Sequence, residues 1–146
     1  MGRLYIHSDG GARGNPGPAG IGYVILNADK QVLARGSEYI GEATNNVAEY
    51  TALKQALLAA ARFGDGPVEV FSDSELMVKQ IKGEYRVKHA NLQPLYAEVC
   101  DLLRGFRSYK VTHVRRELNK EADALVNAGI DAHLGQASSP VPSIDG

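Results

Sequence analysis

The sequence predicts an α/β fold in which a mixed five-stranded sheet carries helices on both faces. The first third of the chain contains segments with the β-rich, alternating composition of strands. Later segments alternate between short apolar strands and helices with a 3.6-residue apolar period. The expected element order is βββαβααβα. The first three strands should be antiparallel, and strands separated by helices should pair in parallel through right-handed crossovers.

Three strands, a loop and a helix are expected in the first part of the chain. The strands are predicted at residues 3–9, 21–27 and 31–40. The Gly- and Pro-rich stretch 10–20 predicts a loop, and a turn around Ala28-Asp29 joins the second and third strands. The helix is expected at 44–64, ended by Gly64, with an apolar stripe of Tyr50, Leu53, Leu57, Ala60 and Ala61.

The second part of the chain alternates strands and helices around a polar, basic connector at 84–90. The expected order is a strand at 66–73, helices at 74–83 and 91–106, a strand at 109–114 and a helix at 117–134. The last helix should bury one side, formed by Leu118, Ala122, Leu125, Val126 and Ile130. Residues 1–133 are expected to form a single domain, and the Ser/Pro-rich residues 134–146 a mobile tail.

The composition excludes several classes of protein. Of the 146 residues 44% are hydrophobic, but no apolar run approaches a membrane span and no signal-peptide pattern opens the chain. The lone Cys100 cannot form an internal disulfide and is expected to be buried. A cytoplasmic protein is therefore expected, and a monomer is the default expectation because the sequence gives no sign of an oligomer. The net charge of −1 gives no global attraction to nucleic acid, so such a partner would be held by local basic groups and by metal.

Four acidic residues stand at the ends of the predicted elements, namely Asp9, Glu49, Asp73 and Asp123. Asp9 and Asp73 stand at the ends of predicted strands, and Glu49 and Asp123 lie near the starts of predicted helices. Folding can therefore bring the four acids to one edge of the sheet. Two charges about 5 Å apart repel by roughly 3 kcal/mol at an effective dielectric constant near 20, so such a cluster needs a cation. Mg²⁺ prefers oxygen ligands, and paired Mg²⁺ ions serve phosphodiester chemistry. The pattern indicates a metal-dependent nuclease.

Each acid also has an ordinary structural explanation, as a turn or helix-capping residue. The alternatives are a turn at Asp9-Gly10, a capping box of Asn46 with Glu49, capping by Asp73 of the helix that begins at Ser74, and placement of Asp123 at the positive end of a helix capped by Asn119. These roles do not require the four sites to converge, so the joint pattern favours the metal site.

Four segments, in this order, resemble type 1 ribonuclease H (ribonuclease HI) from about residue 3 to about residue 132. They are SDGGARGNPGPAGIGYVI (8–25), TNNVAEYTALKQAL (44–57), FSDSELMVKQIKGEY (71–85) and NKEADALVNAGI (119–130). The resemblance implies a ribonuclease H catalytic domain over residues 1–133. It further implies cleavage of the RNA strand of an RNA–DNA hybrid, leaving a 5′-phosphate and a 3′-hydroxyl.

The resemblance also implies roles for the four acids around two Mg²⁺ ions. Asp9 would bridge both ions, and Asp123 would help to hold the ion that activates water. Glu49 and Asp73 would hold the ion facing the leaving 3′-oxygen. Mn²⁺ is expected to substitute because it shares the preference for oxygen ligands.

Substrate contacts follow from the same motifs. Asn15, Asn45 and Asn46 match polar residues that line the RNA minor groove, where a 2′-hydroxyl distinguishes RNA from DNA. The backbone of Gly10, Gly11 and their neighbours would approach the RNA closely, Thr44 matches a DNA-phosphate position, and Tyr85 would pack on DNA sugars. The alternatives are capping and turn formation for the asparagines and a core or rim position for Tyr85.

Two departures from the family pattern stand out. Many members carry a basic insertion before the third helix that grips the hybrid, whereas only GEYRVKHAN (83–91) is present here. The basic residues that remain for this grip are Lys82, just before the segment, and Arg86, Lys88 and His89 within it. Many members also place a histidine in a loop before the last helix. His113 falls within the predicted strand, so Arg116 is the candidate to polarise phosphate or to help release product, and a solvated loop is its alternative.

Other functions remain open at this stage. A hybrid-binding module that does not cut is disfavoured because all four acids are present. Another nuclease on the same fold, such as a DNA junction resolvase, is disfavoured by the TNN and GNPG strings. A structural domain with routine helix caps is the last alternative.

Overall fold

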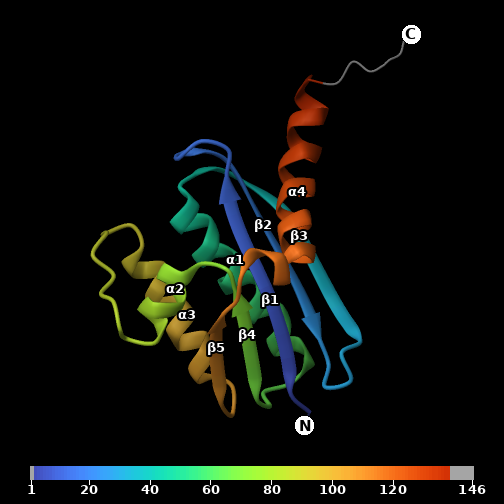
Figure 1. Cartoon of the computed structure of the whole chain (residues 1–146), viewed down its shortest axis with the longest axis vertical. Helices are drawn as coiled ribbons and strands as arrows, with labels where there is room; N and C mark the ends of the chain where they lie inside the picture. Colours follow the sequence, from blue (N-terminus) through green and yellow to red (C-terminus); the bar gives the residue numbers. More distant parts are fainter. Residues whose placement is uncertain (1, 139–146) are drawn as a thin grey trace.

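The computed structural model describes residues 2–138 and forms one five-stranded sheet with helices on both faces (Figure 1). The strand order is β3-β2-β1-β4-β5. The antiparallel half of the sheet consists of β1 (Leu4–Ala12), β2 (Gly17–Leu26) and β3 (Val32–Ala43). β4 (Val68–Ser72) pairs in parallel with β1, and β5 (Tyr109–His113) pairs in parallel with β4. The predicted α/β fold and mixed sheet are confirmed, and β1 is the central strand.

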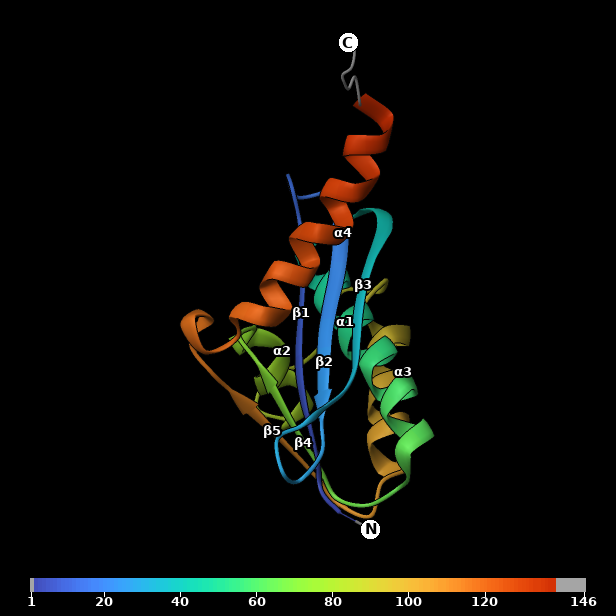
Figure 2. The ribbon, with the colours of Figure 1, turned by 90° about the vertical axis from the view of Figure 1, so that its right-hand side faces the viewer.

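Four helices cover the two faces of this sheet. They are α1 (Asn45–Ala60), α2 (Glu75–Ile81), α3 (Gln93–Arg104) and α4 (Lys120–Ser138). Figure 2 shows α4 crossing one face of the sheet, with α1 and α3 packed on the opposite face. Two short 3₁₀ turns, η1 (Ala61–Phe63) and η2 (Arg116–Leu118), adjoin α1 and α4. Within residues 2–138, no helix has the length and apolar character needed to span a membrane.

The main hydrophobic core lies between the sheet and the helices α1 and α3. The predicted stripe of α1 is buried at Tyr50, Leu53, Leu57 and Ala60. Ala61 is exposed, contrary to the prediction, because the chain tightens into η1 at this residue. Cys100 is half-buried rather than buried.

On the other face, α4 buries Ala122, Val126 and Ile130 against the sheet, as predicted, and Leu125 is half-buried. Leu118 is 63% exposed because it belongs to η2 and precedes α4, so its predicted burial is wrong.

The predicted loop at residues 10–20 is largely strand, because β1 continues to Ala12 and β2 begins at Gly17. The glycines of this stretch allow helices to approach the sheet closely. A Cβ atom at Gly10 would lie 2.2 Å from the carbonyl oxygen of Ala48 in α1. A glycine inside a strand often marks such a close backbone approach. This packing brings α1 directly against the end of β1.

The last helix is longer than predicted, and it continues through Ser138 instead of ending at residue 134. Gly135 lies within it, although an interior glycine costs about 1 kcal/mol relative to alanine. Residues 134–138 therefore belong to α4, and the rest of the predicted tail, 139–146, lies outside the described residues.

Candidate active site

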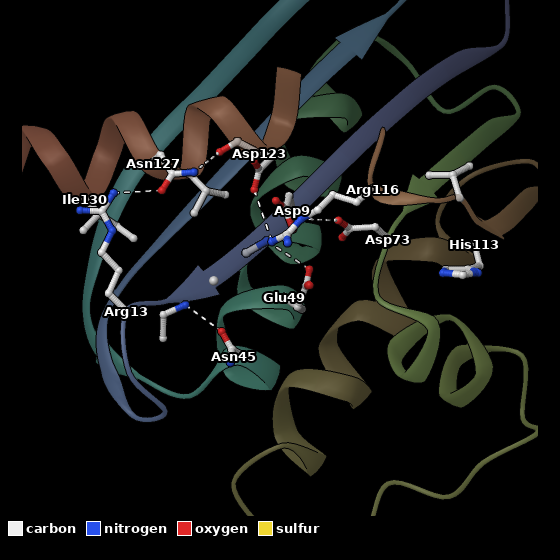
Figure 3. Close-up of a pocket in the computed structure, with 15 residues that line it drawn as sticks. Asp9, Arg13, Asn45, Glu49, Asp73, His113, Arg116, Asp123, Asn127 and Ile130 are labelled. Carbon is white, nitrogen blue, oxygen red and sulfur yellow. Dashed lines mark hydrogen bonds and ion pairs between the residues drawn. The ribbon is translucent and has the colours of Figure 1, made fainter. Parts of the chain in front are cut away.

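Three of the four predicted acids meet where the parallel pairing of β1 with β4 ends, after Ser8 and Ser72 (Figure 3). Asp9 lies on β1, Asp73 directly follows β4, and Glu49 projects from α1. One carboxylate oxygen from each residue lies within 4.8 Å of the others. Asp123, in the first turn of α4, lines the same cleft from the opposite face of the sheet. Folding thus brings together oxygen donors from four elements that are far apart in the sequence.

Neighbours of Glu49 and Asp73 cap the helices α1 and α2, so these two carboxylates have no capping role. Thr44 caps α1, because the Val47 N–H donates to Thr44 Oγ1 at 3.2 Å. The alternative explanation of Glu49 as part of a capping box with Asn46 is therefore wrong. Glu49 Oε1 instead accepts a hydrogen bond of 3.1 Å from the backbone N–H of Gly10, across to β1.

Ser74, and not Asp73, caps α2 in the same way. The Met77 N–H donates to Ser74 Oγ at 3.3 Å. The alternative explanation of Asp73 as a helix cap is therefore wrong, and its carboxylate lies in the cluster with Asp9.

Asn119 ties the start of α4 to β1. It is 2% exposed, and its Nδ2 donates to the backbone oxygen of Ser8 at 2.9 Å, so its side-chain amide is used across the sheet. Its own carbonyl accepts the Asp123 N–H at 3.1 Å. Asn119 thereby connects the residue before Asp9 with the turn that carries Asp123.

Burial and mutual repulsion perturb the acids strongly. Burial raises the pKa of Asp9 to about 8, and the negative charges of Asp73 and Asp123 add to this increase. Burial likewise raises the pKa of Glu49 well above its usual value, with further contributions from Asp9 and Asp73, against the lowering effect of the Gly10 N–H. With a pKa of about 8, Asp9 keeps its proton at neutral pH unless a cation replaces it. An all-oxygen donor set with this charge fits Mg²⁺.

The acids line a cleft of about 480 Å³. Arg116 lies at its edge and is 78% exposed, with Nε 3.9 Å from Asp73 Oδ2 and Nη2 3.8 Å from Asp123 Oδ1. His113 at the end of β5 also lines the cleft. Two further lining residues, Arg13 and Asn127, were not predicted. Asn127 could have been found, because it lies one helical turn after Asp123, whereas Arg13 was hidden in the stretch interpreted as a loop.

The predicted substrate residues fall into two groups. Gly10, Gly11 and Asn45 line the cleft, and Asn15 adjoins it: Asn45 Oδ1 accepts the Ala12 N–H at 2.9 Å, and Asn15 Oδ1 accepts the Asn45 N–H at 3.0 Å. The other group lies outside the lining of the cleft and consists of Thr44, Asn46 and Tyr85.

The connector between α2 and α3 carries the exposed basic residues of the predicted grip. Tyr85 in this connector is 51% exposed, with Lys79 Nζ 5.1 Å from the centre of its ring. The basic side chains are all exposed, at Lys82, Arg86, Lys88 and His89.

Comparisons with known proteins give a consistent family. A family model described as reverse transcriptase-like matches residues 7–129. Ribonuclease HI of Halobacterium salinarum is 44% identical over 130 residues, which are 89% of this chain and 65% of that protein. Ribonuclease H of Chromohalobacter salexigens is 34% identical over 90% of this chain and 86% of its own length. The bifunctional protein Rv2228c of Mycobacterium tuberculosis is 43% identical, and the chain spans 38% of its length.

Solved structures agree with these matches. The crystal structure of RNase H1 from Halobacterium salinarum is 44% identical and has a TM-score of 0.87, covering 90% of this chain and 99% of that chain. LC11-RNase H1, solved in complex with an RNA/DNA hybrid, is 46% identical with a TM-score of 0.85 over 90% of this chain and 99% of its own. Sequence identity, sheet topology and the convergent acids agree, and the chain belongs to the ribonuclease H family.

Proposed function

We propose that this chain is an endoribonuclease that hydrolyses the RNA strand of RNA–DNA hybrids and leaves 5′-phosphate and 3′-hydroxyl ends. The observation that carries the proposal is the cluster of the buried Asp9 with the half-buried Glu49 and Asp73, in which one carboxylate oxygen of each lies within 4.8 Å of the others. The 46% identity to an RNase H1 solved with an RNA/DNA hybrid supports the choice of substrate.

Two Mg²⁺ ions, which Mn²⁺ can replace, complete the proposed site. Asp9, Glu49, Asp73 and Asp123 would hold them, because these four carboxylates are the anionic oxygen donors of the cleft. When bound, such ions place positive charge on the entering and leaving oxygens of a phosphodiester. The protein contributes the rigid placement of its donors: the Gly10 N–H orients Glu49, and Asn119 anchors the start of α4 beside Asp123.

The proposed readers of the RNA strand are Asn15, in the β1–β2 connection, and Asn45 and Asn46, at the start of α1. The side-chain oxygens of Asn15 and Asn45 accept internal N–H groups, so their amide NH₂ groups are left to donate to a 2′-hydroxyl, which DNA lacks. Asn46 would extend this contact along the minor groove, with the backbone of Gly10 and Gly11 against the same strand.

The DNA strand is proposed to rest on two residues outside the cleft. Thr44 Oγ1 accepts the Val47 N–H, which leaves its hydroxyl hydrogen to donate to a phosphate at the start of α1. Tyr85 presents an exposed ring for packing on sugars.

Arg116→Ala is expected to lower the turnover of a hybrid about tenfold or more, with a smaller effect on its binding. The guanidinium lies 3.9 Å from Asp73 and 3.8 Å from Asp123, where a scissile phosphate would be bound, and arginine pairs well with phosphate. It cannot serve as an ordinary acid or base because it does not lose its proton. Single-turnover rates and the Kd for the hybrid separate the two effects, with Arg115→Ala as the neighbouring control. An unchanged rate would favour the alternative interpretation, in which Arg116 is a solvated loop residue without a role in cleavage.

Incubation with Mg²⁺ and four labelled substrates tests the proposal. These are an RNA–DNA hybrid, double-stranded RNA, double-stranded DNA and single-stranded RNA. Cutting confined to the RNA of the hybrid is expected. Binding of the hybrid without cutting would indicate a recognition module, and cutting of DNA would indicate another nuclease on the same fold.

A further inference from the structure

We propose that Arg13 is a second phosphate-binding residue of the cleft, which holds a phosphodiester of the RNA strand next to the one being cut. This inference rests on the proposed hybrid-cleaving function. Arg13 lies directly after β1, and Figure 3 shows it on the opposite side of Asp9 from Arg116. The Arg116 guanidinium lies between Asp73 and Asp123, whereas Arg13 lies beside Asn127 of α4 (Figure 3).

The guanidinium of Arg13 is held in place by two residues of α4. Its Nη1 lies 2.6 Å from Asp131 Oδ1, and its Nη2 donates to Asn127 Oδ1 at 2.9 Å. Asn127 Nδ2 in turn donates to the backbone oxygen of Asp123 at 3.1 Å, which orients the amide oxygen toward Arg13. This chain of hydrogen bonds fixes Arg13 relative to the helix that carries Asp123.

Electrostatics gives Arg13 a reason to face substrate. The strand is polyanionic, the protein has a net charge of −1, and the cleft contains four carboxylates. Among residues 2–138, the cleft is lined by two arginines and by no lysine. A guanidinium has five N–H donors and matches phosphate geometry, so Arg13 keeps donors for a phosphate after its contacts with α4 are made. The ion pair of Arg13 with Asp131 competes only weakly with a phosphate for the guanidinium, because the Asp131 carboxylate is 66% exposed.

Removal of Arg13 tests the proposal through binding and its salt dependence. In an Asp9→Asn background, which prevents cutting, Arg13→Ala should raise the Kd for a hybrid about fivefold and reduce the slope of log K against log salt by about one. The matched control is Arg35→Ala. Arg35 pairs with Glu121 of α4 at 2.5 Å and is exposed, but it lies outside the lining of the cleft, so its removal should leave both quantities unchanged.

Two further measurements distinguish a phosphate contact from a structural latch. Asp131→Ala should bind the hybrid as tightly as the parent protein or more tightly, because it frees the guanidinium. A single uncharged methylphosphonate linkage, placed at successive positions of the RNA strand within a 2′-deoxy nucleotide, should weaken binding to the parent protein at one position near the cut. Arg13→Ala should be insensitive at that position. The control substrate has the same 2′-deoxy nucleotide at that position but an ordinary, charged phosphodiester.

The outcomes separate the inference from the function on which it rests. Equal losses of affinity in Arg13→Ala and Asp131→Ala would assign Arg13 to holding the β1–β2 connection against α4 and would overturn the inference. The inference would also be overturned if Arg13→Ala left the Kd and the salt slope unchanged while the wild-type protein cut the hybrid. A wild-type protein that neither binds nor cuts the hybrid would instead refute the proposed function.

Discussion

Asp9→Asn is expected to abolish cleavage of an RNA–DNA hybrid while leaving the melting temperature of the metal-free protein unchanged or higher. Asparagine has nearly the shape of aspartate but carries no charge with which to hold a cation. Asp9 is 4% exposed and faces Glu49 and Asp73 within 4.8 Å. The substitution therefore removes the carboxylate that is proposed as the central metal ligand and, at the same time, relieves repulsion within the acid cluster.

The raised pKa of Asp9 gives this prediction a pH dependence. The carboxyl group titrates near 3.8 when unfolded and near 8 when folded, so between these values the folded state holds a proton that the unfolded state has lost. The free energy of unfolding of the metal-free protein should therefore fall as the pH rises from about 4 to about 8, by at most about 1.4 kcal/mol per pH unit for this group. The raised pKa of Glu49 likewise makes the free energy of unfolding fall as the pH rises.

Thermal melts in a chelator between pH 5 and pH 8, combined with cleavage assays in saturating Mg²⁺, check both parts. The decline with pH should be shallower in Asp9→Asn than in the wild-type protein. Asp29→Asn, which changes an exposed acid in the β2–β3 turn, should keep the wild-type activity and pH dependence. Cleavage by Asp9→Asn in saturating metal would remove Asp9 from the mechanism, and a wild-type stability that rises with pH would contradict the raised pKa.

The acid cluster could be predicted because its position depends on topology. Parallel pairing of the first and fourth strands places Ser8 opposite Ser72, so the next residues, Asp9 and Asp73, lie close together. Arg13 gave no comparable signal. Its place in the cleft depends on contacts with Asn127 and Asp131, which are more than 110 residues away, and local periodicity contains no information about such pairs.

The glycines of residues 10–22 show a different limit of prediction from sequence. Turn formation and close packing both select glycine, and a single sequence does not distinguish them. Here Gly10 lies beneath α1 and Gly22 beneath α4, where a Cβ atom would be 2.3 Å from the carbonyl oxygen of Ala122. The strands therefore continue through a stretch with the composition of a loop. The helices α1 and α4, which carry Glu49 and Asp123, pack on these two positions.

Gly10→Ala is expected to be among the most damaging single substitutions in the chain. Its Cβ atom would lie 2.2 Å from the oxygen of Ala48, 2.3 Å from its carbonyl carbon and 2.6 Å from the nitrogen of Glu49. All three atoms are backbone, so β1 and α1 must separate. We expect a loss of roughly 3 kcal/mol in the free energy of unfolding, or about 10 °C in melting temperature. Cleavage should fall further, because the Gly10 N–H orients Glu49 and the shift separates Glu49 from Asp9.

Gly11→Ala is the matched control because it adds the same methyl group one residue later on the opposite face of β1. Its Cβ atom would meet only Val126 Cγ1 at 3.8 Å and Asn45 Oδ1 at 4.0 Å, which are ordinary contacts. The free energy of unfolding of Gly11→Ala should stay within about 1 kcal/mol of the wild-type value, since alanine suits a strand better than glycine does. Only stability is compared, because Gly11 lines the cleft. Equal melting temperatures of the two variants would contradict the prediction. They would show that the close packing of α1 on Gly10 does not determine the position of Glu49 beside Asp9.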